Sequence, residues 1–310
     1  MSVLTVVLAL LAALANAASS VLQRRVAAQD AEGQESARQV RWLLRLLRDP
    51  YWVVGAALLA VTTVLQAAAL AVGSLALVQP LMASELLFTL VVGSVVFHRR
   101  PDRRTWLAFG ALAVGLALFL GAAAPSAGRD TASPGTWAVA GPAVLCVVAV
   151  LAAAGRLSRG ASRAALFGSA SAVAFGGTAA LLKEVTGRLP QGVGPVLTQW
   201  PLYATGAVGG ISFLLLQGAL RAGTLAASQP ALTLGDALTS VALGWVLFGE
   251  QIALGVRVLP EVIGIALIGL GSLGLARAPS VHGAWDTAAA ARDGPDGDPR
   301  HARDSRRRES

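Results

Sequence analysis

One stretch of eight residues occurs twice in this chain, as GSLALVQP at residues 73–80 and as GTLAASQP at residues 223–230. The offset between the copies is 150 residues. Two flanking dipeptides match at an offset of 151, Leu65-Gln66 with Leu216-Gln217 and Val96-Phe97 with Leu247-Phe248. Glutamine followed by proline is uncommon inside an apolar run, so the match favours a duplicated unit.

The sequence around both copies is strongly apolar. Of the 310 residues, 55% are hydrophobic and 14% are charged, and the mean hydropathy is +0.64, which lies well outside the usual composition of soluble domains. A helix needs about 20 apolar residues to cross about 30 Å of hydrocarbon. We therefore predict an all-α polytopic membrane protein with nine transmembrane helices, in the apolar runs Met1–Leu22, Tyr51–Val72, Ser74–Phe97, Thr105–Ala123, Thr136–Ala154, Arg163–Lys183, Pro195–Gly218, Ala222–Phe248 and Leu259–Ala276.

The repeat relates the two halves of these nine runs. It aligns the third run with the eighth, the second with the seventh and the fourth with the ninth, and by extension the first with the sixth. Because five is odd, runs that are five apart cross the membrane in opposite directions. We predict an inverted repeat (4 + 5), an arrangement typical of secondary transporters, with a first membrane repeat over 1–123, an external loop over 124–135, a second membrane repeat over 136–276 and a disordered cytoplasmic tail over 277–310.

The basic residues predict the orientation. The chain has 25 basic and 17 acidic residues, a net charge of +8. With the N-terminus outside, fifteen arginines fall in inside segments, against three arginines and Lys183 on the outside. The positive-inside rule therefore predicts the N-terminus out and the C-terminus in, in a multi-pass protein of the plasma (inner) membrane. The arginines cluster between apolar runs rather than on one polar face, so we expect no nucleic-acid partner.

The segment 35–49 differs from the spans. Arginines recur there at spacings of three and four, with Val, Trp and Leu between them. This pattern predicts a cytoplasmic amphipathic helix on the anionic leaflet. We interpret it as a surface anchor; a gate or a lipid sensor is the alternative.

Two acidic residues fall near the middle of repeat-related spans. Glu85 comes six residues after Gln79, and Asp236 comes seven residues after Gln229. A carboxylate at the bilayer centre costs about 2.5–3.5 kcal/mol on insertion scales. We predict that both belong to a cation or proton site at the repeat interface and assign them as metal ligands; the alternative is a protonated or hydrogen-bonded structural role.

Other polar and conformationally special residues fall in the same spans. We predict Pro80 and Pro230 as hinges, because each removes a helix hydrogen bond and frees backbone carbonyls. Polar side chains that are predicted to line the path, or alternatively to form interhelical hydrogen bonds worth about 0.6 kcal/mol, are Gln79, Gln229, Thr62, Gln66 and Asn16. Glycines in several spans predict close helix packing or a homodimer face. The adjacent Lys183 and Glu184 are interpreted as a local salt-bridged helix end.

No signature of enzyme chemistry occurs in the sequence. HExxH, a Walker lysine motif and a paired histidine cluster are all missing, so we expect neither an enzyme nor a cofactor. The single cysteine, Cys146, excludes an intrachain disulfide.

The ends of the third and eighth spans resemble a known family. They read VFHRRP at residues 96–101 and VLFGEQ at residues 246–251, each before a glycine-rich span. This pattern resembles the drug/metabolite transporter (DMT) superfamily, EamA-like, in which each repeat closes in a Gly-Glu pair. Gly249-Glu250 keeps the pair, whereas the first repeat has His98-Arg99. The stretch 17–25 and the residues PLMA at 80–83 are also similar to the NIPA-type magnesium transporter branch.

The resemblance implies a DMT-type secondary transporter that works by alternating access. It implies Mg²⁺ or another small cation as substrate, which suits carboxylate oxygens. The branch pattern does not require an acid at the place of Glu85, and an organic cation suits the site equally. Proton-coupled export of a cationic drug or metabolite, and a non-transporting membrane scaffold anchored through 35–49, remain as alternatives. The expected partners are the lipid bilayer and a small cationic substrate, Mg²⁺ or H⁺ among them.

Overall fold

The computed structural model describes residues 3–31, 50–96, 102–123, 128–222, 225–251 and 258–277. The predicted amphipathic helix at 35–49 lies entirely outside the described residues, and so does the predicted tail beyond residue 277. Every regular element in the described ranges is helical. Eight helical segments there are long and apolar enough to cross a membrane, and Leu259–Leu275 is a shorter apolar helix. The all-helical, multi-pass character that the sequence predicts is therefore confirmed.

The helices follow the predicted runs closely. Their bounds are α1 (Val3–Ala31), α3 (Pro50–Val72), α4 (Leu75–Met82), α5 (Glu85–Val96), α6 (Arg103–Ala123), α7 (Pro134–Leu157), α8 (Gly160–Gly187), η1 (Leu189–Gln191), α9 (Val193–Leu197), α10 (Trp200–Ala222), α11 (Leu225–Phe248) and α12 (Val258–Ala276).

Two predicted boundaries are wrong by five residues or more. The helix α1 continues to Ala31, nine residues past the end of the apolar run at Leu22, because backbone hydrogen bonds do not require apolar side chains and alanine is a strong helix former. The run predicted to start at Pro195 contains the short helix α9, and α10 begins only at Trp200. The Thr198 hydroxyl donates to the Pro195 carbonyl there (2.8 Å), in the turn between the two helices.

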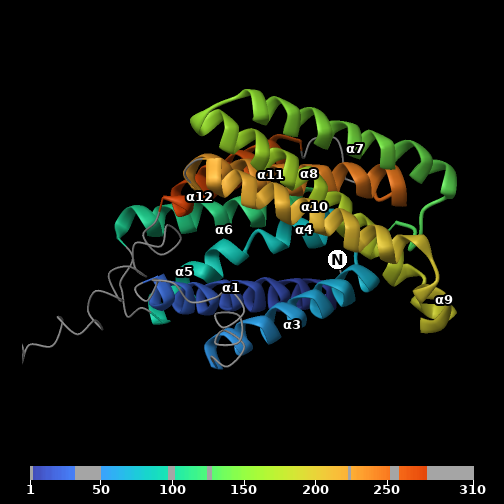
Figure 1. Cartoon of the computed structure of the whole chain (residues 1–310), viewed down its shortest axis with the longest axis horizontal. Coiled ribbons are helices and arrows are strands. Elements are labelled where there is room, and N and C mark those ends of the chain that lie inside the picture. The colour runs from blue at the N-terminus through green and yellow to red at the C-terminus, as the bar shows by residue number, and fades with distance from the viewer. Residues whose placement is uncertain are drawn as a thin grey trace, which may run out of the picture.

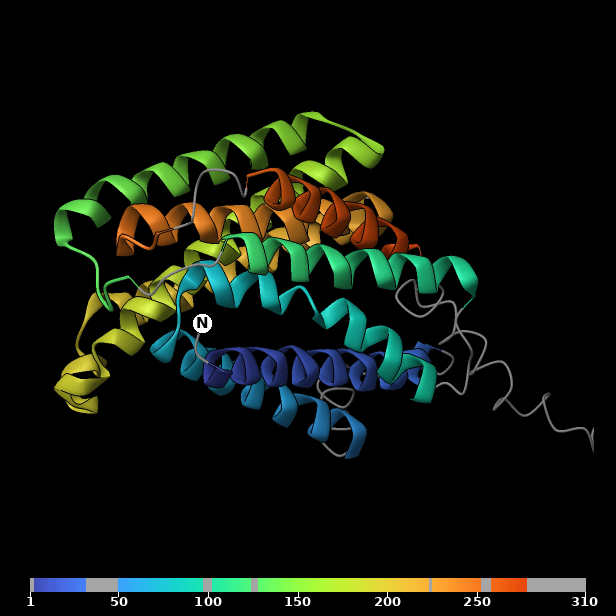
Figure 2. The same cartoon turned by 180° about the vertical axis from the view of Figure 1, so that it is seen from behind.

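The helices pack along one another in pairs. The helix α1 packs along α3, and α8 packs along α10 and α11, while α6 packs along α12 and α4 contacts α11. Figures 1 and 2 show α1 and α3 on one side of the bundle and α7 on the opposite side, with α4 and α6 between them. The buried core runs through this middle layer, around Leu75, Leu112 and Phe248.

The third span is broken in the middle. The helix α4 ends at Met82 and α5 begins at Glu85. Pro80 lacks an N–H, and its ring disfavours a regular helix around it. At the break itself, the amides of Ala83 and Ser84 bond to the carbonyls three residues back, Pro80 (3.1 Å) and Leu81 (3.0 Å). The break makes Glu85 the first residue of a new helix, where a carboxylate is stabilised by the helix dipole.

Glycines allow α6 and α12 to touch backbone to backbone. A Cβ atom added to Gly264 would lie 2.7 Å from the Phe119 nitrogen, and one added to Gly271 would lie 2.5 Å from the Leu112 nitrogen. Gly264 and Gly271 therefore allow close helix packing, which was one of the two interpretations of the glycines, the other being a homodimer face. By contrast, a Cβ atom at Gly206 or Gly210 on α10 would meet no atom within 4 Å.

We expect Gly264→Ala to lower the free energy of unfolding by about 1–3 kcal/mol, because the added methyl group must push α6 and α12 apart. The matched control is Gly110→Ala on α6, where a Cβ atom meets nothing within 4 Å; it should be neutral or stabilise by up to about 1 kcal/mol. Unfolding in mixed detergent micelles measures both. Equal stability of the two variants would show that the close approach is unimportant.

Candidate functional site

Two polar side chains from distant parts of the sequence are hydrogen-bonded inside the bundle, and a second carboxylate lies within electrostatic range of them. Asn16 on α1 donates through Nδ2 to Glu85 Oε2 at the start of α5. Asp236 on α11 lies close enough to Glu85 for the two carboxylates to interact electrostatically. Its Oδ1 is inaccessible and has no hydrogen-bond partner. All three had been predicted as site residues, and the fold brings them together.

Hydroxyl groups adjoin both carboxylates. Ser84 immediately precedes Glu85, and Ser240 lies one helical turn after Asp236. The Ser84 hydroxyl oxygen is buried without a hydrogen-bond partner, and the buried Ser240 hydroxyl interacts with the Asp236 carboxylate. Gln79 is also buried, and its Nε2 has no partner. Buried polar groups are usually hydrogen-bonded, so the unpartnered oxygens of Ser84 and Asp236 are what an oxygen-ligated cation or a proton would complete, whereas the Gln79 amide nitrogen requires an acceptor.

The site has few protein ligands for a metal ion. Within the described ranges, no group of three or more His, Cys, Asp and Glu side chains is arranged to hold one. Glu85 and Asp236 therefore supply two carboxylates, and the Asn16 amide oxygen is a third potential ligand. Mg²⁺ commonly keeps several waters and takes only one or two carboxylates from the protein, so this small donor set fits a hydrated cation.

The other predicted residues have different surroundings. Thr62 is buried on α3, and its hydroxyl donates to the Leu58 carbonyl (2.9 Å), with the Ala12 carbonyl of α1 at 3.5 Å. Gln66 is half-buried one turn further along α3. Pro80 is buried three residues before the break, whereas Pro230 lies within an unbroken α11. The side chain of Gln229 lies outside the described residues.

A second polar cluster was missed by sequence reasoning. Lys183 on α8 forms a salt bridge with Glu250 at the end of α11 (2.9 Å), and their side chains are 5% and 0% exposed. The Glu250 carboxylate also accepts hydrogen bonds from the backbone amides of Leu75 (2.6 Å) and Ala76 (2.8 Å). Lys183 Nζ donates in addition to the Gly73 carbonyl (2.8 Å). This buried pair therefore caps the N-terminus of α4 and joins it to α8 and α11.

Two glycines shape the Glu250 position. Gly249 has φ +64°, a left-handed conformation that glycine adopts without strain, and this turn brings the Glu250 amide to the Gly244 carbonyl (3.0 Å). A Cβ atom on Gly244 would lie 2.3 Å from Glu250 Oε2. The Gly249-Glu250 pair at the end of the eighth span thus turns the chain so that the Glu250 carboxylate lies against the last turns of α11, beside Gly244.

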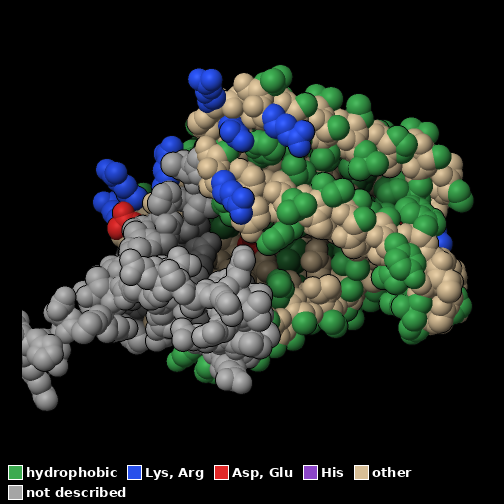
Figure 3. All heavy atoms as spheres, in the orientation of Figure 1, with side chains coloured by type: hydrophobic (Ala, Val, Ile, Leu, Met, Phe, Trp, Pro, Cys, Tyr) green, Lys and Arg blue, Asp and Glu red, His purple; other side chains and the backbone are tan. Residues whose placement is uncertain are grey.

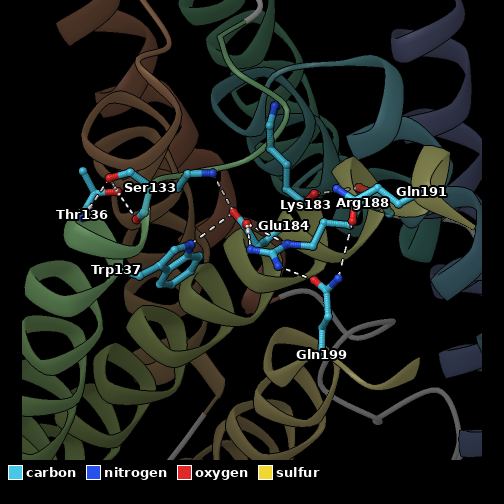
Figure 4. Close-up of polar contacts among 10 residues, drawn as sticks. Ser133, Thr136, Trp137, Lys183, Glu184, Arg188, Gln191 and Gln199 are labelled. Carbon is cyan, nitrogen blue, oxygen red and sulfur yellow. Dashed lines mark hydrogen bonds and ion pairs between the residues drawn. The ribbon is translucent and has the colours of Figure 1, made fainter. Parts of the chain in front are cut away.

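Glu184 has partners of its own. Its carboxylate accepts hydrogen bonds from the Ala132 amide (2.8 Å), the Trp137 indole (3.1 Å) and the Arg188 guanidinium (2.6 Å). Arg188 in turn donates to Gln199. Figure 4 shows Glu184 pointing toward Trp137 and Arg188, and Lys183 pointing away from it.

The interpretation of Lys183 and Glu184 as one local ion pair is therefore wrong. Adjacent residues on a helix do not face each other, so each side chain pairs elsewhere, Lys183 with Glu250 and Glu184 with Arg188. One signal in the sequence pointed to this result. Lys183 is the only lysine in the chain and lies at the end of an apolar run, where a buried charge requires a buried partner.

Comparisons with known proteins give one informative match. The chain is 27% identical to an uncharacterized protein of Corynebacterium glutamicum over 277 residues, which are 84% of this chain and 93% of that protein. No family model matches the chain, and no solved structure matches it. The relative thus shares nearly the full length with this chain, and its description carries no activity.

We expect Lys183→Met to lower the free energy of unfolding by about 3–5 kcal/mol, because it leaves the Glu250 carboxylate buried without its cation. The loss should show in denaturant titrations of the purified protein in micelles. Asp130→Asn is the control, since Asp130 is an exposed acid in the loop before α7. A loss of less than about 0.5 kcal/mol in Lys183→Met, a change typical of exposed surface positions, would contradict a structural role for the pair.

Proposed function

We propose that this chain is a DMT-type secondary transporter, and not an enzyme, that moves a small cation or cationic metabolite across the plasma membrane by alternating access. The observation that carries the proposal is the cluster of Asn16, Glu85 and Asp236. Charged groups inside membrane-spanning bundles mark ion and substrate pathways. This cluster also draws its members from both sequence halves, as a site at a repeat interface requires.

Helix packing supports the inverted repeat. If the first and second spans correspond to the sixth and seventh, α1 with α3 corresponds to α8 with α10, and both pairs pack side by side. The remaining related pairs, α4 with α11 and α6 with α12, contact each other directly, as expected for elements next to a pseudo-two-fold axis.

Helix length and charge support nine spans with the N-terminus outside. The helix α12 has 19 residues, which gives about 28 Å at 1.5 Å per residue, close to the hydrocarbon thickness. Figure 3 shows described Lys and Arg side chains gathered at the end of the bundle where α6 begins and α7 meets α8. In the proposed orientation this is the cytoplasmic end.

The two carboxylates suggest how transport is coupled. With both ionised and no cation between them, their repulsion and poor solvation disfavour an empty site in the closed bundle. A bound cation or proton removes that penalty. The protein then converts readily between its outward-open and inward-open states when the site is occupied, and slowly when the site is empty. Coupled exchange requires this difference.

Two substrates remain in competition within this mechanism. Mg²⁺ fits a site that offers carboxylate oxygens and leaves room for bound waters. Export of a cationic drug or metabolite against H⁺ is favoured by the small number of potential metal ligands in the described ranges, because two carboxylates suffice to exchange an organic cation for a proton.

We expect Glu85→Gln and Asp236→Asn each to reduce transport at least tenfold, because each removes one of the two charges that attract the cation. Purified protein in liposomes is assayed with Mg²⁺ and with tetraphenylphosphonium, while a trapped pH dye reports proton flux. Asp130→Asn, on an exposed loop acid, should transport like the unmodified protein. Transport at the unmodified rate in both site variants would rule out the proposed site.

Mg²⁺ binding is tested separately by thermal stability. If the native protein binds Mg²⁺, a concentration of ten times Kd adds about 1.4 kcal/mol to its stability. The rise in melting temperature should be absent in the double variant Glu85→Gln/Asp236→Asn. No stabilisation by Mg²⁺ at millimolar concentration, with intact proton-coupled tetraphenylphosphonium transport, would favour the organic-cation exporter.

A further inference from the structure

A pocket of about 400 Å³ lies between the start of α8 and the end of α10, and none of the central-site residues lines it. Three arginines line it, Arg159 in the turn before α8, Arg163 in the first turn of α8 and Arg221 at the end of α10. Phe167 and Gly218 also line it and supply apolar surface. The pocket combines a cationic rim with an apolar wall.

The charge of this pocket is not compensated by the described residues. No acidic side chain lines it, and neither of the two salt bridges in the described ranges involves these arginines. Three guanidinium groups that share one pocket repel one another. An anion bound among them would relieve the repulsion and accept their hydrogen bonds.

Local geometry adds donors of a fixed orientation. Gly160 lines the pocket and is the first residue of α8, where the amides of the first turn lack partners within the helix. The preceding residue, Arg159, provides no side-chain cap. A helix N-terminus attracts anions, so it acts in the same direction as the arginines. The Arg163 guanidinium lies over the Phe167 ring (5.7 Å to the centroid), which restrains it at the pocket wall.

The pocket lies at the ends of two candidate membrane spans, Gly160–Gln191 and Trp200–Ala222. It adjoins the ends of α7 and α10 and the start of α8, at the end of the bundle where basic side chains gather (Figure 3). Large apolar side chains are exposed beside it, with Leu157 89% and Leu220 40% exposed. An amphiphile seated here would place its headgroup among the arginines and its chains along these leucines.

We propose that this pocket binds the phosphate group of an anionic ligand, carried either by a phospholipid headgroup or by a soluble phosphate. Arginine recognises phosphate through paired hydrogen bonds in a fixed fork, and basic pockets between membrane helices bind anionic headgroups. The assignment is independent of the proposed transport function, because it uses none of the residues of the central site.

The test uses the full chain in nanodiscs of phosphatidylcholine alone or with phosphatidylglycerol or cardiolipin. Native mass spectrometry after release counts the lipids that the protein retains. We expect retention of the anionic lipids over phosphatidylcholine, and a loss of about tenfold in that preference in Arg163→Gln, since one charge-assisted contact is removed. Arg156→Gln is the matched control, because Arg156 is exposed near the end of α7 and does not line the pocket.

A second measurement uses the unmodified protein and identifies the source of the phosphate. Inorganic phosphate or pyrophosphate is added to the protein in a zwitterionic detergent, and the melting temperature of the protein is measured. A chloride salt at equal ionic strength, without sulfate, is the reference. Stabilisation by these ions without lipid preference supports the pocket and assigns it to a soluble phosphate. Lipid preference without such stabilisation assigns it to a headgroup. Neither effect, or an equal loss in Arg163→Gln and Arg156→Gln, overturns the proposal.

Discussion

The buried ion pair between Lys183 and Glu250 is the constraint on which the arrangement of the bundle depends. A carboxylate without accessible surface requires full compensation, and here it has one ammonium group and two backbone amides. Those amides belong to the first turn of α4, the ammonium group comes from α8, and the carboxylate follows α11. One side chain thus fixes three helices relative to one another and sets the start of the short helix that leads to Glu85.

The central site follows from that anchored start. Because α4 is held at its first turn and the chain breaks after Pro80, α5 begins at Glu85, beside Asn16 of α1 and near Asp236 of α11. The two clusters therefore have different chemistry. The ion pair that follows α11 is fully compensated and serves structure, whereas the central site contains buried oxygens without hydrogen-bond partners at Ser84 and Asp236.

The apolar runs were sufficient to predict an all-helical, multi-pass chain, and the repeat drew attention to Glu85 and Asp236. The runs mark the spans because lipid-facing surface must be apolar, and Glu85 and Asp236 stand out because a charge there has no structural purpose that leucine would not serve. Sequence alone did not predict the partner of Lys183, since Glu250 is 67 residues away and only the fold brings the two together. The late start of α10 was missed for a related reason, because hydropathy does not distinguish a short apolar turn from the helix that follows it.

The break after Pro80 has no equivalent in α11, the helix that carries the second Gln-Pro motif, since α11 runs unbroken past Pro230. An unbroken rod transmits a tilt from one end to the other, whereas two short rods joined by a bend turn separately. The first turn of α4 is held by its cap. The break leaves α5 free of that restraint, and Glu85 is the first residue of α5. The two segments that carry the Gln-Pro motif therefore differ in construction around the central acids, because the first is jointed and the second is continuous.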